Sequence, residues 1–141
     1  MKNLLAVFIG GGIGACFRYL LALFLLNYNI TFQGTFIINI IGCLFFGFVT
    51  YIAIKREKVF SSELKLFLTT GIAGGFTTFS TFSFELVSML TSGLILNAFL
   101  YMTISMVMGL FAIGLGMFAA RKVLLLSLNL KLIQPVCKLN K

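Results

Sequence analysis

Residues able to hold ions gather in one otherwise apolar stretch of the chain, residues 71–85. Gly74 and Gly75 are adjacent there, and neighbouring glycines weaken a helix. Hydroxyl residues follow closely, namely Thr77, Thr78, Ser80, Thr81 and Ser83. Their side chains can bond back to the preceding turn of an intact helix. Alternatively the helix breaks, so that freed carbonyls face a cation and a new helix start presents N–H groups to an anion. The adjacent glycines and the hydroxyl residues together favour the broken helix.

Two pairs of side chains stand at helical spacing. Phe79 and Phe82 are three residues apart and share a face of any helix that contains them. Aromatic ring edges are positive and can face an anion, but in a chain with 17 phenylalanines the spacing alone favours packing or lipid contact. Tyr101 and Ser105 are four residues apart. They form either a polar track or helix–helix hydrogen bonds, and spacing alone favours the hydrogen bonds.

Two further polar residues lie inside apolar segments, where a buried polar group needs a reason. The amide of Asn39 either joins two helices by a hydrogen bond or lines a pore as a donor. Arg18 lies too deep in its segment to reach the membrane surface easily. It either pairs with backbone carbonyls or Glu85, or it supplies a positive potential that attracts an anion. The residue types alone leave both pairs of alternatives open.

The elements that must position these residues are membrane helices. Of 141 residues, 60% are hydrophobic and 10% are charged, which excludes a soluble domain of this size. Four apolar runs, at about residues 4–26, 34–54, 64–90 and 94–120, each reach the roughly 20 residues that span a bilayer. The fold class predicted is an all-α membrane protein with four transmembrane helices in residues 1–122. Residues 123–141 form a tail that is either an interfacial helix or disordered.

Small residues recur at the spacing that lets membrane helices approach closely. The pairs, each four residues apart, are Gly10 with Gly14, Gly71 with Gly75, and Ala112 with Gly116. We therefore expect close backbone contacts at these positions.

The residue types exclude most enzyme chemistry. Histidine, the commonest general base, is absent. The acidic residues are only Glu57, Glu63 and Glu85, which argues against paired-carboxylate catalysis and carboxylate metal sites. Cys16, Cys43 and Cys137 form no C-x-x-C pair, and we interpret them as small buried hydrophobic residues.

The net charge of +8 could indicate nucleic-acid binding, but the basic residues flank the apolar runs, where they set membrane orientation. Of eleven basic residues, only Arg18 lies inside a run. With four spans the other ten fall on one side of the membrane: Lys2, Lys55, Arg56, Lys58, Lys65, Arg121, Lys122, Lys131, Lys138 and Lys141. The positive-inside rule then places both termini in the cytoplasm.

Three motifs occur in order along the chain. They are G-G-x-G-A-x-x-R-Y at residues 11–19, G-T-x-x-x-N-x-x-G at residues 34–42 and G-G-F-T-T-F-S-T-F at residues 74–82. Together with four predicted spans they closely resemble the Fluc (CrcB) family of fluoride channels. The resemblance implies passive fluoride export across the cell membrane and an antiparallel dimer of four-helix subunits, with a broken third helix and with fluoride pathways near the dimer interface.

The resemblance also implies roles for individual residues. Those matching the family's fluoride pathway, including its first-helix arginine, are Asn39, Phe79, Phe82, Ser80, Thr81, Tyr101, Ser105 and Arg18. Gly74 and Thr77 match positions whose backbone carbonyls hold a structural Na⁺ that is not transported. Glu85 receives no firm role.

The charge pattern sets this chain apart from proteins that insert in both orientations, because the predicted split of basic residues is ten to none. The hypothesis is a single orientation and a heterodimer with a related chain of opposite bias, and the alternative is a homodimer. Two alternatives to a channel also stay open: an anion secondary transporter and a non-conducting membrane subunit. Few ionisable residues and no obvious internal repeat argue against the transporter.

Overall fold

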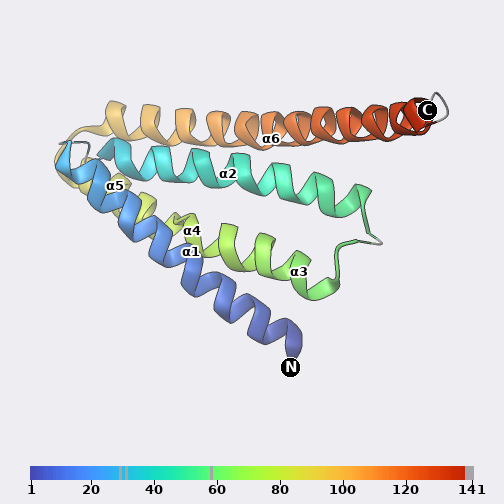
Figure 1. Ribbon diagram of the computed structural model, residues 1–141. Coiled ribbons are helices and arrows are strands. Elements are labelled where there is room, and N and C mark those ends of the chain that lie inside the picture. The colour runs from blue at the N-terminus through green and yellow to red at the C-terminus, as the bar shows by residue number, and fades with distance from the viewer. Residues whose placement is uncertain (29, 31, 58, 139–141) are drawn as a thin grey trace.

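Helices make up nearly all of the described chain, which suits an apolar sequence whose backbone must satisfy its own hydrogen bonds in a bilayer. The computed structural model describes the backbone of residues 1–28, 30, 32–57 and 59–138, and the side chains of residues 1–28, 30, 34–57 and 59–127. Within these residues there is no strand. The elements, drawn in Figure 1, are α1 (Lys2–Asn27), α2 (Phe32–Lys55), α3 (Ser62–Leu66), the π-helix η1 (Phe67–Ala73), α4 (Gly74–Phe76), α5 (Phe79–Thr91) and α6 (Ile95–Lys138).

Three helices in the described part of the chain are long and apolar enough to cross a membrane. They comprise Lys2–Asn27, Gly34–Lys55 and Ile95–Ser127. These segments agree with the first, second and fourth predicted spans. The third predicted span, residues 64–90, is instead divided among α3, η1, α4 and α5, and none of these four is long enough to cross a bilayer alone.

The helices pack in two groups. α2 and α6 lie side by side, whereas α1 packs against α3, η1 and α4 (Figure 1). α5 also contacts both α2 and α6. The third predicted span therefore lies between α1 on one side and the α2–α6 pair on the other.

Close contacts at glycines hold both groups together. A Cβ atom at Gly10 of α1 would lie only 2.5 Å from the carbonyl oxygen of Phe67 on η1. A Cβ at Gly116 of α6 would collide with the carbonyl oxygen of Leu44 on α2. Gly14 and Gly75 make equally close approaches, and Ala112 is buried. The predicted packing at the small-residue pairs is confirmed.

The backbone departs from helical geometry inside the segment 71–85, at its first hydroxyl residues rather than at the adjacent glycines. Gly74 is helical, with φ −66° and ψ −38°. Thr77 and Thr78 are extended instead, with ψ 157° and ψ 118°, and α5 begins at the next residue. The helix thus ends at Phe76, two residues after Gly74, and the extended residues that follow are threonines rather than glycines.

The tail continues the last helix. α6 runs without interruption from Ile95 to Lys138, through Arg121 and Lys122, so residues 123–138 form neither a separate helix nor a disordered segment. The guanidinium of Arg56, just after α2, donates a hydrogen bond to Ser127 Oγ at 3.2 Å. This bond ties the connection between α2 and α3 to the extension of α6.

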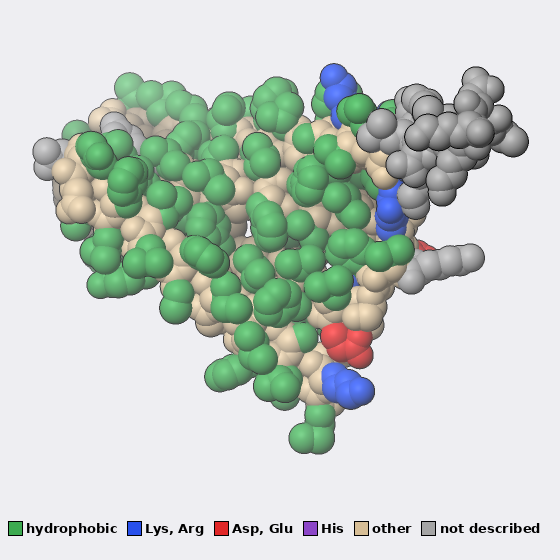
Figure 2. All heavy atoms as spheres, in the orientation of Figure 1, with side chains coloured by type: hydrophobic (Ala, Val, Ile, Leu, Met, Phe, Trp, Pro, Cys, Tyr) green, Lys and Arg blue, Asp and Glu red, His purple; other side chains and the backbone are tan. Residues whose placement is uncertain are grey.

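The surface is strongly apolar, and green hydrophobic side chains cover most of the face in Figure 2. No large side chain among the described residues is fully buried, and long stretches of α1 and α6 expose Phe, Leu and Ile. The expectation that Cys16 is buried is wrong, because it is exposed; Cys43 is half-buried, and the side chain of Cys137 lies outside the described residues. Such a surface fits a membrane protein.

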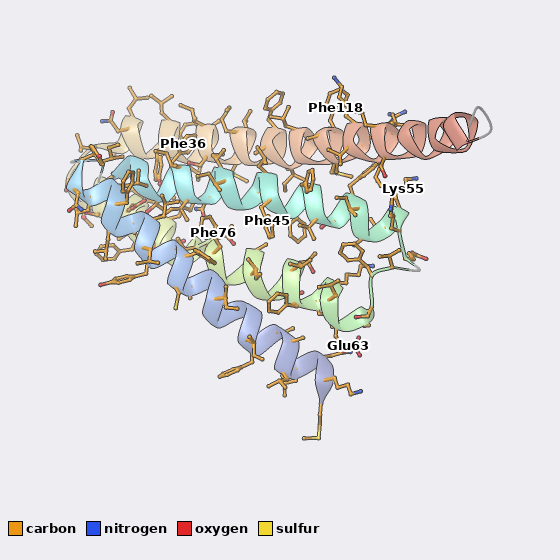
Figure 3. The ribbon with its side chains drawn as sticks, viewed as in Figure 1. Phe36, Phe45, Lys55, Glu63, Phe76 and Phe118 are labelled. Carbon is orange, nitrogen blue, oxygen red and sulfur yellow. The ribbon has the colours of Figure 1, made fainter. Side chains whose placement is uncertain are left out.

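Charged side chains gather at one end. Lys55 and Glu63 both lie where α2 leads into α3 (Figure 3), and the blue Lys and Arg side chains of Figure 2 lie toward this end as well. The side chains of Lys58, Lys131, Lys138 and Lys141 lie outside the described residues.

Candidate functional site

The first feature of the site is a pairing between the Asn39 side chain and the backbone of Thr78. Asn39 Nδ2 donates to the Thr78 carbonyl at 3.0 Å, and the Thr78 N–H donates to Asn39 Oδ1 at 2.8 Å. Because Thr78 is extended, its backbone groups have left the helical ladder, and the amide of α2 satisfies both of them. Asn39 is therefore an interhelical hydrogen-bonding group, and one of its two amide hydrogens remains for another acceptor.

The Thr78 side chain starts the next helix. Its Oγ1 accepts the Thr81 N–H at 3.2 Å, which is the N-cap bond of α5. The same hydroxyl donates to Thr81 Oγ1 at 3.0 Å and lies 3.3 Å from Ser80 Oγ. Ser80 and Thr81, both predicted site residues, thus belong to a hydroxyl cluster at the beginning of α5.

These hydrogen bonds to the N–H groups of Thr78 and Thr81 change which backbone carbonyls accept a hydrogen bond. In a continuous helix the Gly74 carbonyl would accept the Thr78 N–H, and the Thr77 carbonyl would accept the Thr81 N–H. Here Asn39 takes the first N–H and the Thr78 hydroxyl takes the second. The carbonyls of Gly74 and Thr77 consequently lose their helical donors.

Gly74 and Thr77 also line a common cavity of about 320 Å³. Thr69 and Thr70 of η1 and Gly42 of α2 contribute to the same cavity. A Cβ at Gly74 would meet nothing within 4 Å. The described residues hold no cluster of His, Cys, Asp or Glu that could bind a metal, so a cation here would rely on main-chain and hydroxyl oxygens. Unwound carbonyls of this kind suit an alkali cation such as Na⁺.

The extended segment also lines an open groove of about 420 Å³. Four residues of the predicted fluoride pathway line it, namely Asn39, Phe79, Phe82 and Ser105, and Thr77 of the predicted cation site lines it as well. Most of the remaining lining is apolar and comes from α2 and α6, including Phe36, which Figure 3 labels. The groove therefore combines an apolar wall with a few polar groups, which is typical of ligand sites.

The two phenylalanines share one face, as their spacing predicts. Their ring centroids are 6.0 Å apart, and the ring of Phe82 lies 5.3 Å from that of Tyr101. Phe82 is 9% exposed, whereas Phe79 is 80% exposed. Phe82 is thus packed against neighbours within this chain, whereas the ring of Phe79 is free to contact lipid or another chain.

Ser105 offers a hydroxyl to the groove. Its Oγ is buried and has no hydrogen-bond partner among the described residues. Tyr101, one turn earlier, turns instead to Glu85. The predicted track of Tyr101 and Ser105 is therefore divided between two environments.

Glu85 is the residue whose place the sequence leaves undefined. It is buried, and both carboxylate oxygens are paired: Thr35 Oγ1 donates to Oε1 at 2.5 Å and Tyr101 OH donates to Oε2 at 2.7 Å. These bonds join α2, α5 and α6. Thr35 stands four residues before Asn39 on the same face of α2, which is the sequence signal for its participation.

Arg18 is not brought together with the other site residues. It is half-exposed on α1 and lines neither the groove nor the cavity of Gly74 and Thr77. The carboxylate of Glu85 takes its hydrogen bonds from Thr35 and Tyr101 instead. Tyr19, the residue after Arg18, lines a third cavity of about 430 Å³ together with Glu85.

Long apolar helices around a sparsely polar groove define a helical membrane protein. Residues 5–117 match the family described as "CrcB-like protein, Camphor Resistance (CrcB)", and the chain belongs to this family. The family inferred from the three motifs is confirmed.

Several relatives that align with most of this chain share one name, "Fluoride-specific ion channel FluC". The protein of Phocaeicola vulgatus is 43% identical over 118 residues, covering 82% of this chain and 96% of the relative. That of Flavobacterium psychrophilum is 42% identical over 125 residues, covering 86% and 99%. That of Clostridium perfringens is 50% identical over 96 residues, covering 65% and 74%. These are channels, which agrees with the prediction that the chain is not an enzyme.

Proposed function

We propose that this chain is a subunit of a fluoride channel, which lets fluoride leave the cell passively and relieves its toxicity. The observation that carries the proposal is the groove in which Asn39, Phe79, Phe82 and Ser105 meet. The name shared by its relatives supports fluoride as the ion.

The groove has suitable chemistry for a small, strongly hydrated anion. The second amide hydrogen of Asn39 and the unpartnered hydroxyl of Ser105 are donors that can replace water around the ion. The ring edges of Phe79 and Phe82 add a weak positive field. The rest of the lining is mostly apolar and carries no charge, so these donors attract the anion without a fixed positive charge that would trap it.

The third span is part of the same proposal. We infer that α3, η1, α4 and α5 together cross the bilayer as one helix broken at Thr77 and Thr78, which makes four spans in all. A structural Na⁺, held by the carbonyls of Gly74 and Thr77 and not transported, would be the cation of this break. The redirected N–H groups and the shared cavity support that assignment.

We infer that the working unit is an antiparallel dimer in the cell membrane, with both termini of this chain in the cytoplasm. The open groove and the exposed ring of Phe79 support a second subunit that completes the pathway. The one-sided basic charge favours a heterodimer with a related chain of opposite orientation. A homodimer is the alternative, and labelling of tags at both termini from each side of the membrane separates the two.

Fluoride efflux tests the function. The purified chain is reconstituted in fluoride-loaded liposomes, and release is followed with a fluoride electrode, with chloride-loaded liposomes as the selectivity control. We expect rapid fluoride release without chloride release. If the chain alone is silent, co-expression with a related chain of opposite bias should restore release; silence there as well would refute the proposal.

Substitutions in the groove distinguish a channel from the alternatives. Phe82→Ile and Phe79→Ile should slow efflux, whereas Phe99→Ile, on the exposed surface of α6, should not. Unchanged efflux in both groove variants would favour a non-conducting subunit. Saturable efflux coupled to a counter-ion would favour a secondary transporter.

A further inference from the structure

We propose that Asn39 and Thr78 are positioning residues for the cation, because their side chains capture the two backbone N–H groups that would otherwise occupy the carbonyls of Gly74 and Thr77. The inference rests on the proposed channel and on its cation site, and it adds that a residue of the anion groove controls the cation site.

The first step concerns Asn39 and Gly74. The amide of Asn39 holds the Thr78 N–H at 2.8 Å and the Thr78 carbonyl at 3.0 Å. Without this side chain, two buried backbone groups lose their partners, which is costly in a bilayer. The nearest remedy for the Thr78 N–H is the Gly74 carbonyl four residues earlier, because that bond merely continues α4.

The second step concerns Thr78 and Thr77. The Thr78 hydroxyl holds the Thr81 N–H at 3.2 Å. Without the hydroxyl, this N–H can return to the Thr77 carbonyl, which again is the bond of a continuous helix. Each loss therefore removes one oxygen from the set that the cation would use.

The third step concerns location. Thr77 lines both the groove and the cavity with Gly74, and Asn39 lines the groove alone. The two spaces share three lining residues, namely Thr77, Cys43 and Ile113. The hydrogen-bonded pair of Asn39 and Thr78 therefore lies next to the carbonyls of the cavity, and a change at Asn39 can reach them directly.

The test measures binding of Na⁺ itself. The midpoint of thermal unfolding of the full-length protein, followed by circular dichroism, is recorded as sodium chloride replaces choline chloride at constant ionic strength. A cation that binds only the folded state raises this midpoint in a saturable way. We expect Asn39→Ala and Thr78→Val to raise the Na⁺ concentration of half-maximal stabilisation roughly tenfold or more, about 1.4 kcal/mol.

Matched variants separate this role from general stability. Thr78→Ser keeps the hydroxyl and should restore the dependence on Na⁺ of the unaltered protein. Asn97→Ala and Thr103→Val make similar changes at exposed positions on α6, away from the break, and should leave that dependence unchanged. If Asn39→Ala does not fold, the Thr78→Val and Thr78→Ser pair carries the test, since valine keeps the shape of threonine and removes only the hydroxyl.

Two results would overturn the inference. In one, both variants lower the unfolding midpoint in choline but keep the Na⁺ dependence of the unaltered protein, so that they are merely structural. In the other, the unaltered protein shows no stabilisation by Na⁺, so there is no bound cation whose site Asn39 and Thr78 could position. Fluoride efflux from the same preparation reports on the channel itself, so its success or failure is read independently.

Discussion

The α2–α6 pair is built of uninterrupted helices, whereas the segment from α3 to α5, which is richer in Ser and Thr, is built of short pieces. Hydroxyl residues alone do not explain the difference. Thr103 of α6 donates to the carbonyl of Phe99 at 2.9 Å, and Thr69 of η1 donates to that of Lys65 at 2.7 Å, and both helices continue. At Thr78, by contrast, a side chain of another helix takes the backbone N–H. In this chain the helical hydrogen bonds are interrupted where a neighbouring helix offers replacement partners.

The largest effect is expected from a substitution that disrupts the packing of α2 against α6. Gly116→Val places side-chain atoms against the Leu44 carbonyl, a backbone group that cannot move aside without shifting α2. We expect loss of folded protein, since overpacking costs about 1–3 kcal/mol even where side chains can yield. Size-exclusion chromatography in detergent measures the outcome. Gly114→Val, on the same helix with nothing within 4 Å, is the control, and equal behaviour of the two would contradict the packing.

The next effect falls on the broken segment. Asn39→Ala removes both bonds to Thr78 and one groove donor, so fluoride efflux should fall by roughly tenfold or more, as expected for the loss of about 1–3 kcal/mol. Liposome efflux per folded protein gives the measurement. Efflux equal to that of Asn97→Ala would show that the pairing does not support conduction.

A smaller effect concerns the bonds that connect the two regions. Tyr101→Phe and Thr35→Val each remove one donor to Glu85 and should each lower the free energy of unfolding by about 1–2 kcal/mol. In the double variant, the loss in the free energy of unfolding should differ from the sum of the two single losses, because both partners share one carboxylate. Thermal unfolding of the four proteins measures this. Strict additivity would mean that the two hydroxyls act independently.

The smallest effect is expected at the extension of α6. Arg56→Gln weakens a bond to Ser127 in a position only half-buried, so stability should change by at most about 0.5 kcal/mol. Fluoride efflux should not change. A marked loss of efflux would give this contact a role that the groove does not explain.

Sequence reasoning succeeded where structure is local. Hydrophobic runs gave the approximate ends of α1 and α2 and the start of α6, and four-residue spacing gave the glycine contacts and the shared face of Phe79 and Phe82. It did not identify the partner that holds the extended residues, because Asn39 is 39 positions away from Thr78. The partners of Glu85 escaped it for the same reason, since Thr35 is 50 positions away.

The tail shows a different limit. Arg121 and Lys122 mark the end of the apolar run, and charge is a reasonable sign that a span ends. It is no sign that a helix ends, because lysine and arginine are good helix formers. α6 accordingly continues beyond them.

The groove is open along one side of this chain. Inside a bilayer, the open side of a single subunit faces hydrocarbon, which offers no hydration to a moving ion. If the proposed dimer is the working unit, a single subunit would not conduct, and leakage would be prevented by assembly. At low protein density the conductance should then rise with the product of the numbers of the two subunits, which for the homodimer alternative is the square.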